Sequence, residues 1–178
     1  MIGTFAFVTS LVTQPQLSQV EFQVQNRGSF VVTLDRTAAP NTCAHFQSLV
    51  EQKVYNGMLW HRKVNNFVLQ TGDPDSKSML PEEARRLPGE NGGTSGLGES
   101  TFGKPIPFEK SPMSHLKGTL GIALESPGDN SGSSHFFINL ADNKRLDGKY
   151  VAFAKVTEGW DVIEKCHRGD LILSAKMK

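Results

Sequence analysis

The sequence has few of the features that mark secreted, membrane-spanning or strongly charged proteins. Its 178 residues include only two cysteines, Cys43 and Cys166, which fit free thiols in an intracellular protein better than a disulfide scaffold. The formal net charge of +1 is no basic excess of the kind that nucleic-acid-binding proteins carry. No apolar run reaches the roughly 18 residues of a membrane span. We therefore expect a cytoplasmic protein, with the nucleus also open, that binds neither membrane nor nucleic acid.

The amino-terminal segment lacks the signs of a targeting peptide. The first basic residue is Arg27, whereas secretory signals begin with positive charge and mitochondrial presequences are rich in arginine. We expect residues 1–19 to form an extension that is loose or adds an edge strand, and residues 20–178 to form one domain. A chain of this length can bury roughly 70% of the surface that it exposes when unfolded, so it can form a stable hydrophobic core without disulfide bonds.

Alternating and β-branched runs predict many short strands. Val20, Phe22 and Val24 alternate with polar residues and precede a turn at 26–28. The complete set of predicted strands is 20–25, 29–35, 59–64, 67–72, 118–124, 135–140, 150–156 and 171–173.

Two helices are predicted between the strands. Helical spacing of Phe46, Leu49 and Val50 indicates an amphipathic helix over 42–53, which Asn41 would cap, and a shorter helix is expected over 161–166. Short strands with two helices favour a closed antiparallel β architecture. The stretch 73–105 reads instead as a loop far longer than the usual 4–6 residues, and loops of that length are commonly functional.

Two motif matches are rejected. Gly98 to Lys104 resembles a phosphate loop, but Pro105 stands where Ser or Thr should ligate Mg²⁺. The pairs Cys43/His45 and Cys166/His167 have zinc-ligand spacing, yet each is expected on its own helix, and small buried thiols beside surface imidazoles explain them without a metal. We therefore expect no metal site.

The informative segment is 59–73, LWHRKVNNFVLQTGD, where a cation and an amide lie within apolar strands. With a two-residue turn at Asn65-Asn66, Arg62 would face Leu69; with a three-residue turn that includes Phe67, it would pair with Gln70. The second register sets a rigid hydrogen-bond donor beside an aromatic wall, which suits peptide binding without a nucleophile. The sequence leaves both registers open, and Arg62 on an outward strand face is the simpler alternative.

The chain resembles the cyclophilins. The resemblance rests on HRKVNNFVLQTGD (61–73), FGKPIPFE (102–109), GTLGIAL (118–124) and residues 133–166, and it extends from about Val20 to Leu173. It implies a closed eight-stranded antiparallel β-barrel capped by two α-helices, peptidyl-prolyl cis/trans isomerase activity on proline-containing peptides or proteins, no cofactor, and a monomer. Residues 74–93 look like an insertion relative to shorter members.

The resemblance also assigns site residues. Arg62 matches the family's catalytic arginine, Gln70 the glutamine that helps to hold it, and Phe67 and Phe137 the walls of the proline pocket. The further positions that it implies as substrate contacts are His61, Val68, Ala123, His135, Arg145, Leu146 and Tyr150.

Four of these positions depart from the family pattern. Val68 stands where Met is usual, His135 where Gln is usual, Arg145 where many members have Trp, and Tyr150 where many have His. Because the family's Trp contacts cyclosporin, Arg145 predicts weakened binding of that drug with isomerase activity largely kept. The departures also keep open an alternative, a non-catalytic module that captures a proline-containing segment of a partner protein.

Overall fold

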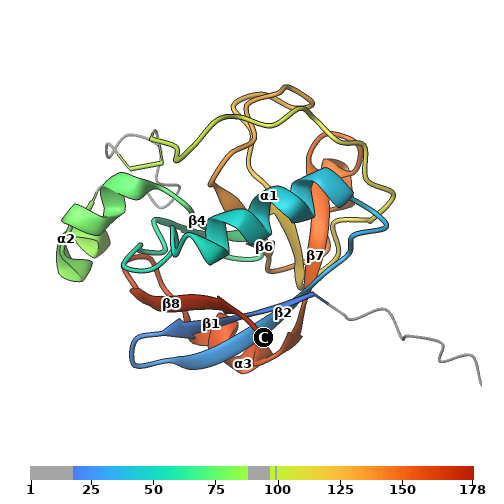
Figure 1. The fold of residues 1–178 in the computed structure, drawn as a ribbon. Helices are drawn as coiled ribbons and strands as arrows, with labels where there is room; N and C mark the ends of the chain where they lie inside the picture. The colour runs from blue at the N-terminus through green and yellow to red at the C-terminus, as the bar shows by residue number, and fades with distance from the viewer. Residues whose placement is uncertain (1–17, 88–96, 99) are drawn as a thin grey trace, which may run out of the picture.

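The computed structural model describes residues 18–87, 97–98 and 100–178, which form an eight-stranded antiparallel sheet flanked by helices (Figure 1). All eight predicted strands are present. They are β1 (Gln19–Val24), β2 (Gly28–Leu34), β3 (Arg62–Val64), β4 (Val68–Thr71), β5 (Thr119–Ile122), β6 (Phe136–Asn139), β7 (Val151–Glu158) and β8 (Ile172–Met177). The helices are α1 (Pro40–Glu51), α2 (Pro81–Arg86) and α3 (Trp160–Lys165), with 3-10 turns η1 (Pro74–Ser78) and η2 (Lys144–Leu146).

The sheet is an open half-barrel, so the prediction of a closed barrel is wrong. The strand order is β3-β4-β6-β5-β7-β2-β1-β8, and within the described residues no ladder joins β3 to β8. β3 is only three residues long, and the chain ahead of it meets the chain ahead of β8 through one bridge, Leu59 to Leu171. A backbone hydrogen bond from Trp60 N to Asp170 O, at 3.0 Å, lies beside that bridge. The two edge strands, β3 and β8, do not extend far enough along the chain to pair with each other. The barrel is therefore joined on this side by the bridge and a few backbone hydrogen bonds.

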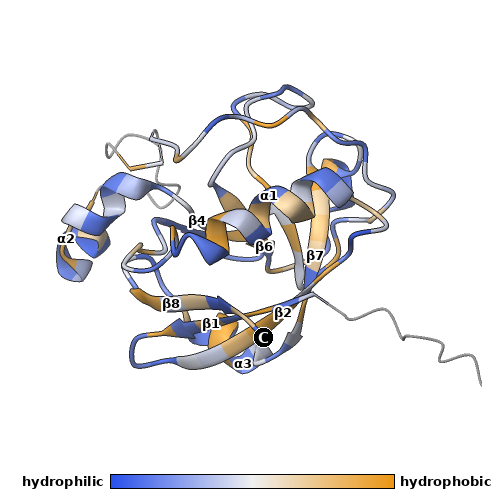
Figure 2. Cartoon of the chain, in the orientation of Figure 1, coloured by the Kyte–Doolittle hydropathy of each residue, from blue (hydrophilic) through white to orange (hydrophobic). Residues whose placement is uncertain are grey.

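The core is a cluster of aromatic rings enclosed by the curved sheet. The ring of Phe46, on α1, lies with its centroid 5.0 Å from Phe153 and 5.3 Å from Phe136. Phe136 is fully buried, as expected for a core residue. Hydrophobic colour is concentrated along the strands (Figure 2), and α1 packs on β7 and β8 whereas α3 packs on β2. Successive side chains of a strand point to opposite faces of the sheet. Phe136 points into the core, so Phe137, the next residue of β6, points to the other face.

Helix α1 begins differently from the prediction. It starts at Pro40 rather than at 42, ends at Glu51, and Asn41 is not its cap. The backbone N–H groups of Asn41 and Thr42 instead donate to the carboxylate of Glu109, at 3.1 and 2.9 Å. A distant acidic side chain therefore satisfies the free amides and favours the positive end of the helix. Local spacing could not reveal this cap because Glu109 follows 67 residues after Thr42.

The stretch predicted as a long loop contains structure, and the described residues form three α-helices rather than the two predicted. η1 and α2 lie within the proposed insertion 74–93, whereas the part of that insertion from residue 88 onward lies outside the described residues, as do residues 1–17 of the proposed extension. α2 packs by Ala84 against Leu59 and Leu97, beside the bridge between the sheet edges. Within the described part of the chain, no helix is both long and apolar enough to cross a membrane.

Candidate active site

The β3–β4 hairpin sets the register that the sequence left open. Val64 pairs with Val68 and Arg62 with Gln70, so the turn has three residues. Asn66 holds the left-handed conformation at φ 56°, which Asn tolerates better than most residues, and Phe67 N donates to Val64 O at 3.0 Å. This register places Arg62 and Gln70 side by side on one face of the sheet.

Gln70 fixes the guanidinium of Arg62. Arg62 Nη1 donates to Gln70 Oε1 at 3.2 Å, and the Arg62 guanidinium carbon lies 5.8 Å from the centroid of the Phe67 ring. Burial lowers the pKa of the half-buried guanidinium, but an arginine remains charged at neutral pH. The site therefore presents a cation whose orientation is set by a neighbouring amide and an aromatic face.

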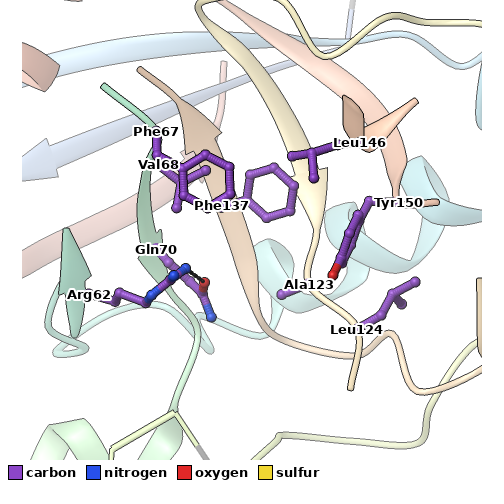
Figure 3. A pocket seen from close by; sticks show the side chains of 9 residues that line it. All are labelled: Arg62, Phe67, Val68, Gln70, Ala123, Leu124, Phe137, Leu146 and Tyr150. Carbon is purple, nitrogen blue, oxygen red and sulfur yellow. Dashed lines mark hydrogen bonds between the residues drawn. The ribbon is translucent and has the colours of Figure 1, made fainter. Parts of the chain in front are cut away.

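A cavity of about 200 Å³, lined by both apolar and polar side chains, opens next to this pair (Figure 3). Figure 3 shows Arg62 and Gln70 at one side of the cavity and Leu146 with Tyr150 at the other, with Phe137 between them. The cavity is lined by Arg62, Phe67, Val68, Gln70, Ala123, Leu124, Phe137, Leu146 and Tyr150. Eight of these nine are predicted site residues, and the ninth, Leu124, was missed.

Phe137 is held in place by aromatic neighbours and by a missing side chain. Its ring lies 5.6 Å from the nearly parallel ring of His115 and 5.9 Å from the perpendicular ring of Tyr150. A Cβ on Gly121, in β5, would lie 2.4 Å from the tip of Phe137 and 2.8 Å from His115 Cε1. The aromatic wall occupies its position because β5 carries glycine there. The interior glycine of GTLGIAL was the available signal, since glycine within a strand indicates a close approach.

His115, which the sequence reasoning also missed, is fixed as a neutral ring. Its Nε2 lies 3.2 Å from Tyr150 O and its Nδ1 lies 3.2 Å from Asn139 Nδ2. Since an amide nitrogen can only donate, Nδ1 accepts and Nε2 carries the proton. Burial lowers the pKa of His115, which agrees with this neutral tautomer beneath Phe137.

His61 and His135, two predicted substrate contacts, do not line the cavity beside Arg62. Both are buried, with ring centroids 5.1 Å apart. His135 instead lines an adjoining cavity that shares Gln70, Ala123 and Leu124 with the first. Burial, with a smaller contribution from the nearby His135, lowers the pKa of His61 to about 3, so this histidine is neutral.

Arg145 is the one predicted site residue that lies on the outer rim. Its guanidinium carbon is 4.7 Å from the centroid of the Phe67 ring, although the residue does not line the cavity itself. Phe67 is therefore flanked by two cations, Arg62 and Arg145.

The cavity offers binding and polarisation but no activated nucleophile. Its lining contains no cysteine, serine or threonine, and in the part of the chain that the structure describes no group of three or more metal-ligating side chains occurs. Cys43 and Cys166 are free and buried, and burial raises the pKa of each thiol to about 12. The cavity can bind an apolar ring of a ligand beside the fixed guanidinium of Arg62. Such a site suits a conformational reaction, in which the ligand is twisted and no covalent bond is broken.

The half-barrel and its cavity define a β protein with a groove beside a fixed cation, and comparisons with known proteins identify the class. Residues 19–177 match the family model of the cyclophilin type peptidyl-prolyl cis-trans isomerases. This chain belongs to the cyclophilin family, as its resemblance predicted.

Relatives and solved structures agree with that assignment. A "Peptidyl-prolyl cis-trans isomerase-like 1" of Emericella nidulans is 36% identical over 140 residues, which cover 78% of this chain and 75% of the relative. "Peptidyl-prolyl cis-trans isomerase ppi1" of Schizosaccharomyces pombe is 32% identical over 156 residues, which cover 88% of this chain and 87% of the relative. The fold is similar to a Cryptosporidium parvum cyclophilin, with a TM-score of 0.72, 23% identity, and coverage of 91% and 98% of the two chains.

Proposed function

We propose that this chain catalyses cis/trans rotation about X–Pro peptide bonds in protein substrates, with the proline ring held in the cavity beside Arg62. The observation that carries the proposal is the Arg62–Gln70 pair, hydrogen-bonded at 3.2 Å on one face of the β3–β4 hairpin, next to that cavity. The structure of the C. parvum relative in the presence of the dipeptide Ala-Pro supports a proline-containing ligand.

The barrier to be lowered comes from amide resonance. Rotation about an X–Pro bond costs about 18–20 kcal/mol and takes tens to hundreds of seconds without catalysis. Reaching milliseconds requires about five decades in rate, or roughly 7 kcal/mol of stabilisation that is specific to the twisted state. No bond is made or broken, so a site without a nucleophile is sufficient.

Each side chain has a part in stabilising the twisted state. As the prolyl nitrogen leaves conjugation, its lone pair becomes a hydrogen-bond acceptor, and Arg62 donates to it. Gln70 holds the guanidinium by accepting from Nη1, so little reorganisation is needed during rotation. Phe137 and Leu146, both buried and apolar, anchor the ring while the preceding residue turns. His61 and His135 are buried and pack against each other, with no direct part in holding the proline ring.

Removal of the cation tests this function. Arg62→Ala should lower kcat/KM for a proline tetrapeptide by about 10²–10³, the usual cost of losing one transition-state donor. Exchange NMR on the peptide measures the rate directly. Lys63→Ala is the matched control, because Lys63 is the neighbouring cation but donates to Glu164 O and Cys166 O, away from the cavity. If wild type and Arg62→Ala accelerate rotation equally little while both bind the peptide, the chain is a binding module and the enzyme proposal fails.

Cyclosporin binding tests the departure at Arg145. We expect this drug to bind weakly, because a charged guanidinium on Phe67 replaces an aromatic contact surface. Arg145→Trp should lower the dissociation constant for cyclosporin by about tenfold, as expected when one aromatic contact is restored. Calorimetry measures this constant. Ordinary family affinity in the wild type would contradict the prediction.

A further inference from the structure

The rim of the proline cavity carries a cation at a fixed position. Arg145 belongs to η2, its neighbour Leu146 lines the cavity, and its guanidinium lies 4.7 Å over the ring of Phe67, which also lines the cavity. The contact with the Phe67 ring restrains the guanidinium, and Arg145 as a whole is exposed, so its N–H groups remain available to a ligand. The cation is thus next to the place where a residue flanking the proline must pass.

The acidic side chains around this rim are engaged elsewhere. Asp147, two residues after Arg145, accepts from Ser114 Oγ at 2.6 Å and from His115 N at 2.7 Å. Asp142 accepts from Lys117 N at 2.9 Å. Among the residues that the structure describes, Arg145 makes no ion pair with any carboxylate.

The charge of this rim is predominantly positive. Lys144, Arg145 and Lys149 are all exposed within six residues, and Arg62 lies on the other side of Phe67. Of the residues that line the two adjoining cavities, the acidic one is Glu125, which lines the second cavity and not the one that Phe67 lines. At the Phe67 ring itself, the two charged groups in contact are the guanidinium groups of Arg62 and Arg145, so a substrate side chain there meets mainly positive charge.

We propose that Arg145 makes the enzyme prefer substrates that carry an anionic side chain, a carboxylate or a phosphate, at a position flanking the isomerised proline. This inference rests on the proposed isomerase function. A guanidinium binds carboxylate and phosphate oxygens through paired N–H groups, and Arg145 can do so without leaving the ring that restrains it. One exposed ion pair gives a modest preference, about two- to fivefold in kcat/KM, which salt weakens.

The test is a peptide series in which a single position varies. Glu, Gln, Lys or phosphoserine is placed in turn at each of the two positions before and after the proline, and each catalysed rate is corrected for the uncatalysed rate of the same peptide. We expect the Glu peptide to exceed the Gln peptide by about two- to fivefold at one side of the proline only, with Lys disfavoured there. The phosphoserine peptide separates a phosphate preference from a general anion preference. Raising the salt from about 0.05 to about 0.5 M should shrink each ratio.

Variants assign the preference to this cation. Arg145→Ala should bring the Glu/Gln ratio close to one, and Arg145→Glu should invert it. Lys155→Ala removes the same charge five residues along β7 from the cavity residue Tyr150, roughly 16 Å away, and should leave both the ratio and the activity unchanged. A Glu/Gln ratio of one at every position in the wild type, or one that survives Arg145→Ala, overturns the inference.

Failure of the inference can be told apart from failure of the proposed function. If Arg62→Ala abolishes activity while the peptides are not discriminated, the isomerase function stands and the Arg145 inference falls. If no peptide is accelerated, the affinities of the same Glu and Gln peptides, measured by NMR titration, decide the inference on binding alone.

Discussion

At the scale of single residues, the shape of the cavity depends on a position that has no side chain. Gly121 leaves the space in which the Phe137 ring lies against His115, and its backbone does not have a positive φ. A methyl group there would act purely through its volume. The wall of the cavity is therefore specified by the residue behind it as much as by Phe137.

Gly121→Ala should displace the Phe137 ring toward the cavity and lower both stability and activity. Overpacking of this kind costs about 1–3 kcal/mol of unfolding free energy, which denaturant titration measures, and KM for a proline peptide should rise. The double variant Gly121→Ala/Phe137→Leu removes the ring tip that the methyl would strike. Its stability should recover relative to that expected from the two single variants, whereas additive losses would contradict a direct clash.

At the scale of elements, a buried carboxylate and a surface arginine both link α2 to the segment ahead of β8. Asp170, 3% exposed, accepts from Arg27 at 2.7 Å and from Arg85 of α2 at 3.0 Å, and also from His167 N at 2.9 Å. Arg168 donates to the carbonyl groups of Arg85 and Leu87, at the carboxyl end of the same helix. Burial alone would raise the pKa of Asp170, but these hydrogen bonds outweigh it and hold the pKa below its usual value.

Asp170→Asn should destabilise the fold by about 1.5–3 kcal/mol, since it removes the charge that accepts hydrogen bonds from Arg27, Arg85 and His167 N, while both arginines stay partly hydrated. Arg85→Ala should cost much less, because that side chain is 49% exposed. Thermal unfolding measures both. Glu158→Gln, which disrupts the exposed pair with Lys178, is the control and should change the melting temperature little. Equal losses for all three variants would rule out a special role for Asp170.

The elements also show where sequence reasoning succeeds. The eight strands follow from alternation and β-branched runs, which are local, and their ends were placed within a few residues for most of them. The start of α1 was missed because Glu109 caps it from another part of the chain. α2 was missed because its six residues bury only Ala84, so it has almost no periodic signal.

The site was predictable to a similar degree. Two registers of the β3–β4 hairpin were compatible with the sequence, and the choice depends on Asn66 adopting a left-handed conformation. The family resemblance identified eight of the nine cavity-lining residues. It could not place His61 outside the cavity or Arg145 on its rim, because burial depends on packing between distant strands. The closed barrel failed for the same reason, since closure depends on how far the two edges reach.

At the scale of the whole molecule, buried histidines make stability depend on pH. Burial lowers the pKa of all five histidines, which are His45, His61, His115, His135 and His167. In the unfolded chain each should titrate near 6.5. Below that pH the histidines of the unfolded chain bind protons, whereas those of the folded chain stay neutral. The free energy of unfolding therefore decreases as the pH decreases.

We expect the free energy of unfolding to decrease from about pH 6.5 downward, with the His61 contribution continuing toward its folded pKa of about 3. Denaturant titrations at intervals between about pH 5 and 7 isolate the histidines, because carboxylates such as Asp170 contribute only below about pH 4.5. His61→Phe should reduce the slope in that window, and the exposed His167→Asn should change it less. A slope that is unaffected by His61→Phe would contradict the assignment.

The pairing of β1 with β8 has a consequence for the order in which the protein can be completed. Val20 lies opposite Met177, and Lys178 N donates to Gln19 O at 2.9 Å. A ribosome makes β1 among the first of the described residues and β8 among the last, so one edge of β1 stays without its partner while about 150 residues are synthesised. Pairings this distant also slow folding. An enzyme that accelerates proline rotation in other chains therefore completes its own sheet only when its final strand becomes available.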